Sequence, residues 1–162
     1  MSVIAVEDFK AHVGLTDPVN DDTAQEILDA AESAVAALVG PLSPTTKTYA
    51  SPATCSRLAL PVLPVVSVET PSGVTVVDGP AGIVTGSFTA DGAVTYTAGY
   101  ADLPADLRLA VLELARHLWQ SSQRGGRPAG PATPVVGAPM GGYLLPNAVA
   151  ALLEPYTMPG FA

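Results

Sequence analysis

The sequence predicts an α+β fold, in which a small helical core of two long helices and short terminal helices carries a β-rich insertion and an extended C-terminal arm. Apolar residues recur at helical spacing before residue 41 and again over residues 103–122, whereas the stretch between them is rich in Thr and Val and lacks that spacing. A chain of 162 residues suits one compact domain with an addition. We therefore expect a domain at 1–124, with its helical core at 3–40 and 103–122 and its insertion at 41–100, followed by a linker and docking arm at 125–162.

Two helices are predicted before residue 41. The first covers residues 3–13, and Gly14 ends it in the left-handed conformation. The second begins at Asp21 or Asp22, whose side chain can cap the free amides of the first turn, and it stops at Gly40. Its expected apolar stripe consists of Ala24, Ile27, Leu28, Ala31, Val35 and Leu38.

The middle of the chain predicts short strands joined by Pro and Gly turns. Thr and Val favour extended backbone, and the residues before Pro61 and Pro64 are pushed out of the helical region. Six strands are expected, at residues 47–50, 57–60, 65–69, 74–77, 83–88 and 93–97.

A long helix is predicted over residues 103–122, because Asp102 can cap it and Pro104 is tolerated in a first helical turn. Its expected apolar face consists of Leu107, Ala110, Val111, Leu114, Leu118 and Trp119. Residues 123–142 are rich in Gly, Pro and Ala and indicate a linker. A short helix at 148–153, closed by Pro155, follows.

The C-terminal arm is apolar and nearly free of charge, with Glu154 as the single charged residue after residue 127. Apolar side chains are costly to leave in water, so we expect the arm to dock in a partner's groove, with packing on its own domain as the alternative. The expected docking residues are Tyr143, Leu144, Leu145, Pro146, Val149, Leu152, Leu153 and Tyr156.

The net charge of −8 argues against a protein that grips nucleic acid through its phosphates. Residues 1–40 hold eight acids against Lys10 alone. The acids of the second helix suggest a solvated face or, alternatively, a channel wall or an inter-subunit face; they are Asp21, Asp22, Glu26, Asp29 and Glu32. The arginines of the last long helix are expected either to complement the dipole of that helix or to contact the acids of a neighbouring copy; they are Arg108, Arg116 and Arg124.

Catalytic and metal-binding motifs are not evident in the sequence. His12 and His117 lie on different predicted helices and lack a second ligand at metal-binding spacing, so packed or surface histidines are the simpler interpretation. Cys55 cannot form an internal disulfide, and an activated thiol there would need one of these imidazoles. No cofactor is expected. The sequence also shows no apolar run long enough to cross a membrane and no secretory signal, so the expected location is cytoplasmic.

Eight short stretches of the sequence are informative through the order in which they follow one another. They are VEDFK at 6–10, HVGLTD at 12–17, LVG at 38–40, LALPVLPVVSV at 58–68, VTYTAGY at 94–100, LPADLRLA at 103–110, LPNAV at 145–149 and LLEPY at 152–156. In this order, over most of residues 5–156, they resemble the head-tail connector, or adaptor, proteins of long-tailed double-stranded DNA bacteriophages.

This resemblance implies a non-enzymatic virion protein that forms a homo-oligomeric ring of twelve copies between the portal protein and the tail-completion or tail-terminator proteins. It implies a location in the neck of the virion, after a period in the host cytoplasm. DNA would pass through the ring without specific binding, which suits an acidic chain. A tail-completion or terminator protein of the same particle is the first alternative. A small cytoplasmic enzyme with a site around Cys55 and His117 is the second.

Overall fold

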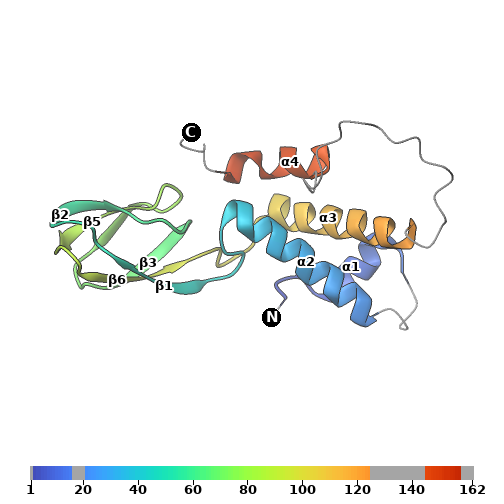
Figure 1. Cartoon of the computed structure of the whole chain (residues 1–162), viewed down its shortest axis with the longest axis horizontal. Coiled ribbons are helices and arrows are strands. Elements are labelled where there is room, and N and C mark those ends of the chain that lie inside the picture. Colours follow the sequence, from blue (N-terminus) through green and yellow to red (C-terminus); the bar gives the residue numbers. More distant parts are fainter. Residues whose placement is uncertain (1, 16–20, 125–144, 158–162) are drawn as a thin grey trace, which may run out of the picture. The chain divides into compact units, whose positions relative to one another are not determined.

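The computed structural model describes residues 2–15, 21–124 and 145–157 (Figure 1). The described residues form two compact units. A helical unit comes from residues 1–32 and 106–155, and a β unit comes from residues 33–105 with the end of the chain from Tyr156. Helices at both ends and antiparallel strands in the middle confirm the α+β fold. In the described ranges, no helix is both long and apolar enough to cross a lipid bilayer.

Helix α1 (Val6–Val13) is shorter than predicted. Gly14 ends it as expected, with φ of 76° and its amide donating to the Lys10 carbonyl. The helix was expected to begin at residue 3, but the amides of Val3 and Ile4 donate to the carboxylate of Glu32. The backbone of Ala5 is extended, with φ of −70° and ψ of 143°, so the residues before Val6 lie outside the helix.

Helix α2 (Asp21–Val39) ends at Gly40, which has φ of 90°. Ala24, Leu28, Ala31 and Val35 are buried as predicted, and Ile27 is half-buried. Leu38 is 45% exposed, so its assignment to the apolar stripe was wrong, and Val39 is buried instead. Eleven residues after Leu28, at 100° per residue, the helix returns to within about 20° of the same direction, which is the position of Val39.

The remaining helices are α3 (Ala105–Arg124) and α4 (Asn147–Leu153), the latter continued by the short 3-10 helix η2 (Glu154–Tyr156). The predicted apolar face of α3 is buried apart from Leu118, which is half-buried. Trp119 packs edge-to-face on Phe9 of α1, with ring centroids 6.3 Å apart. Within the helical unit, α4 lies alongside α3 on the side away from α2 (Figure 1).

The β unit contains two three-stranded antiparallel sheets, with strand orders β1-β6-β3 and β2-β5-β4. All six predicted strands are confirmed to within two residues at either end. Their bounds are β1 (Thr45–Ala50), β2 (Cys55–Ala59), β3 (Val65–Thr70), β4 (Thr75–Asp78), β5 (Ile83–Phe88) and β6 (Ala93–Ala98).

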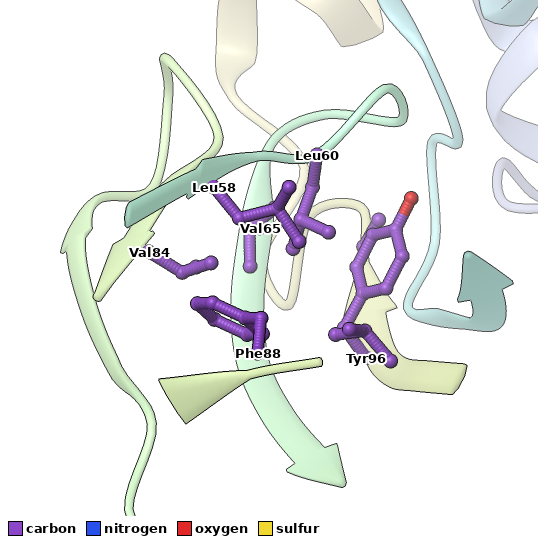
Figure 2. Packing of buried hydrophobic residues seen from close by; sticks show 8 residues of the cluster. Leu58, Leu60, Val65, Val84, Phe88 and Tyr96 are labelled. Carbon is purple, nitrogen blue, oxygen red and sulfur yellow. The ribbon is translucent and has the colours of Figure 1, made fainter. Parts of the chain in front are cut away.

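The core of the β unit draws side chains from both sheets. Figure 2 shows Leu58 of β2 and Phe88 of β5 directed toward Val65 of β3, with Tyr96 of β6 beside them. The Val62 amide donates to the Tyr96 hydroxyl at 3.3 Å. Burial raises the pKa of Tyr96 above its ordinary value, and this hydrogen bond opposes the shift.

Two glycines of the β unit allow close passage of the backbone. Gly40 and Gly99 have φ of 90° and 122°, and a Cβ at either position would collide with a carbonyl group, that of Leu63 or Ser43 respectively. Only glycine tolerates both the left-handed conformation and the contact. These positions therefore fix the path of the chain as it leaves α2 and β6.

Candidate interaction surfaces

The candidate catalytic side chains are divided between the two units. Cys55 is half-buried in β2 and belongs to the β unit, whereas His12 and His117 belong to the helical unit. The His12 imidazole lies 3.1 Å from the Glu113 carboxylate, which joins α1 to α3. Among the residues that the structure describes, no group of three or more His, Cys, Asp and Glu side chains is arranged to hold a metal ion.

Glu32 has a structural role that its sequence position did not suggest. The residue is 9% exposed, and its carboxylate accepts hydrogen bonds of 2.8–2.9 Å from the Ser2 hydroxyl and from the amides of Val3 and Ile4. The expectation of a solvated face therefore fails for Glu32, because its charge is satisfied inside the helical unit. An apolar stripe is interrupted by a carboxylate only where donors of this kind compensate for its burial.

The other acids of α2 face solvent. Asp21 pairs with Lys10, and Asp29 accepts a hydrogen bond of 2.7 Å from Gln25. Asp22, Glu26 and Asp29 follow one another at spacings of four and three residues, so they lie along one side of the helix, and all three are exposed. We call these three residues the acidic stripe.

The predicted basic contacts are partly used within the helical unit. Arg108 donates to Asp8 at 2.7 Å, and both side chains are about half exposed. Arg116 lies 3.7 Å from Glu113, a distance too long for a strong hydrogen bond, and its side chain is 47% exposed. Arg124 is the last residue of α3, and its side chain lies outside the described residues.

A small open groove of about 110 Å³ lies between α3 and α4. From α3 it is lined by Glu113, Arg116, His117 and Gln120, and from the other side by Pro146, Ala148 and Val149. One side therefore presents polar groups and charged groups of both signs, Arg116 and Glu113, and the other presents apolar ones. The sequence did not reveal this groove, because it exists only where the short helix α4 packs on α3.

The predicted docking arm is largely engaged with its own chain. Val149 and Leu153 of α4 are fully buried in the helical unit, and Leu145, Pro146 and Leu152 are half-buried. Tyr156 packs edge-to-face on Tyr100 with ring centroids 6.2 Å apart, and burial together with Tyr156 raises the pKa of Tyr100. Tyr143 and Leu144, with most of the predicted linker, lie outside the described residues. The described part of the arm thus packs partly on its own chain, and docking of the arm on a partner stays a prediction.

No protein-family model matches the chain, and a search of curated proteins finds no match either. Solved structures do match. The fold is similar to that of a chain in a structure of the neck of an empty gene transfer agent particle, and that neck structure was computed with C6 symmetry. The two chains are 21% identical, the match covers 98% of this chain and 91% of that chain, and the TM-score is 0.63. A chain from the virion of a native gene transfer agent particle matches at 20% identity and the same coverage, with a TM-score of 0.65. Both matches include the helical unit and the β unit, and what they show is a similarity of fold.

Proposed function

We propose that this chain is a structural virion protein of the particle neck, a head-to-tail adaptor that forms a ring between the portal protein and the tail-completion proteins. The observation that carries the proposal is the likeness of the whole fold, over 98% of the chain, to a neck component of a particle. The order of the adaptor-like stretches along the sequence is independent support. On this proposal the protein resides in the virion neck after a period in the host cytoplasm.

The proposed ring contains twelve copies. A neck computed with C6 symmetry is compatible with rings whose copy number is a multiple of six, and twelve is one such number. The net charge of −8 suits a ring that conducts DNA without binding it, since an acidic wall repels phosphates. The protein acts without catalysis or cofactor on this view. Its acidic stripe faces either the channel or a neighbouring copy.

A tail-completion or tail-terminator protein of the same particle is the second candidate, because that protein also belongs to a neck and would share an acidic channel. The two candidates differ in their partner. An adaptor binds the portal protein directly, whereas a terminator binds the end of the tail tube.

The experiment that tests the proposal is assembly on purified heads. Tail-less heads that carry the portal protein are mixed with the chain and examined by negative-stain microscopy and by the mass of the released neck. A new ring below the portal with a mass of about twelve chains supports the adaptor. Binding to tails and not to heads supports the terminator and contradicts the adaptor.

A further inference from the structure

The groove between α3 and α4 is lined by exposed polar side chains that are not needed for the packing of these two helices. Arg116 and His117 are exposed at the groove, and Gln120 adds an exposed amide. Glu113 is the acid of the groove, and both His12 and Arg116 lie near its carboxylate. The groove therefore presents donors at its surface beside the small apolar residues Pro146 and Ala148.

The acidic stripe supplies the complementary chemistry on the same chain. Asp22 and Glu26 are exposed and have no ion pair with another described residue, and Asp29 is bonded to Gln25 alone. From Asp22 to Asp29 the stripe rises about 10 Å along the helix. This length is comparable to the stretch of α3 that lines the groove, Glu113 to Gln120, since both span seven steps.

The two surfaces lie on different sides of the helical unit. In Figure 1, α3 lies between α2 and α4. At 100° per residue, the acidic stripe lies on the side of α2 opposite its buried residues Ala24, Leu28 and Ala31, so it faces away from the core of the helical unit. A closed ring of identical copies requires a head-to-tail interface, in which one patch of each copy meets a different patch of the next. Two complementary patches on different sides of one unit meet that requirement.

We infer that neighbouring copies of this chain associate through these surfaces: the acidic stripe of one copy docks on the α3–α4 groove of the next, with Glu26 and Asp29 facing Arg116 and His117. This inference deepens the proposed ring, on which it rests, and it assigns the acidic stripe to the inter-subunit contact and not to the channel wall. The occupant of the groove is a second copy. Charge complementarity across such an interface selects the partner and its register.

The test measures self-association by sedimentation at low salt over a range of concentrations. The charge reversals Glu26→Lys with Asp29→Lys, and separately Arg116→Glu, should each weaken association by roughly tenfold or more, because like charges then face one another. Combining Glu26→Lys with Arg116→Glu should recover most of the loss. Raising the salt should weaken association of the wild-type chain.

Matched controls are Glu7→Lys and Arg57→Glu, which reverse exposed charges outside both surfaces and should leave association unchanged. All the side chains whose charge is reversed are exposed, and folding is checked by circular dichroism and by the fluorescence of Trp119. As a second readout, Glu26→Cys and Arg116→Cys chains in a Cys55→Ser background are mixed with a short bismaleimide. Cross-linked dimers that form only when both cysteines are present support the contact.

The inference is overturned if the reversals on one surface alone do not weaken association, if the combined reversal on both surfaces does not recover it, or if the wild-type chain remains monomeric at about 1 mM. Reversals that leave self-association intact but abolish binding to portal-bearing heads would show that the groove belongs to the portal and not to a second copy. The head-binding experiment fails or succeeds separately, so the adaptor proposal and the proposed contact can be distinguished.

Discussion

At the scale of single residues, Glu32 shows how one buried charge organises the N-terminus. Its carboxylate takes up three donors from residues 2–4, and it is nearly inaccessible to solvent. Without the carboxylate, the amides of Val3 and Ile4 must find water or remain unsatisfied. The segment that precedes α1 is then no longer held on α2.

We expect Glu32→Ala to lower the free energy of unfolding by about 1–3 kcal/mol, because buried donors lose their acceptor. Urea unfolding followed by Trp119 fluorescence measures the change. Glu26→Ala, on the exposed side of the same helix, should change the free energy by less than about 0.5 kcal/mol. Equal effects of the two substitutions would contradict the structural role of Glu32.

Because Tyr96 is buried, we expect the free energy of unfolding to fall at alkaline pH. Burial raises its pKa in the folded state, so the folded protein retains the phenolic proton while the unfolded chain ionises near pH 10. The stabilising contribution is complete below about pH 10 and is lost as the pH rises from there toward the raised folded pKa.

Tyr96→Phe should flatten this alkaline dependence. At pH 8 it should cost about 0.5–1.5 kcal/mol, because the Val62 amide loses its acceptor. Urea unfolding of both proteins at pH 8 and at several values above pH 10 provides the comparison. A variant as sensitive to alkali as the wild-type chain would show that other groups control the transition.

At the scale of elements, the path of the chain at the end of α2 depends on the absence of a side chain at Gly40. A Cβ there meets the Leu63 carbonyl, and its φ of 90° is strained for any other residue. Gly14, at the end of α1, also has a positive φ, of 76°, but has open space around it. Comparing substitutions at Gly14 and Gly40 therefore distinguishes the cost of backbone strain from the cost of steric collision.

Gly14→Ala should therefore cost about 1 kcal/mol from strain alone, whereas Gly40→Ala should cost clearly more, because the Leu63 backbone must also move. Thermal melts by circular dichroism give the two differences. If Gly40→Ala is no worse than Gly14→Ala, the close approach is relieved by a small adjustment and does not determine the path of the chain.

At the scale of the whole molecule, α4 connects the C-terminal sequence to the helical unit. Val149 and Leu153 are both fully buried, and burial of each contributes roughly 1.5–3 kcal/mol. The arm thus has one face occupied by its own chain. Any partner that binds α4 in place must use its other residues.

Truncation before Leu145 should destabilise the helical unit while the β unit stays folded, since the buried cluster around Tyr96 and the apolar side chains packed against it come from residues 49–98. Trp119, the single tryptophan, reports on the helical unit, and the NMR signals of Tyr96 report on the β unit. A truncated chain that keeps the wild-type tryptophan transition would show that α4 contributes little and is free to dock elsewhere.

Much of the fold follows from the sequence because it depends on local signals. Thr- and Val-rich segments between turn residues indicate the strands, and Gly14 and Gly40 indicate where α1 and α2 end. Backbone propensity and the conformational freedom of glycine act within a few residues, so they can be recognised without knowledge of the partner surfaces. The acidity of the second helix is evident from its residue types alone.

Only the tertiary structure decided which side chains meet. The sequence pattern places Glu32 among the solvated acids, because the donors to its carboxylate lie about thirty residues earlier in the chain. Leu38 and Val39 are adjacent apolar residues, and the packing direction of α2 determined which one is buried. The groove exists because α4 packs on α3 across a long intervening segment. Contacts of this kind depend on the distant surface that each segment reaches, and a local pattern does not contain that information.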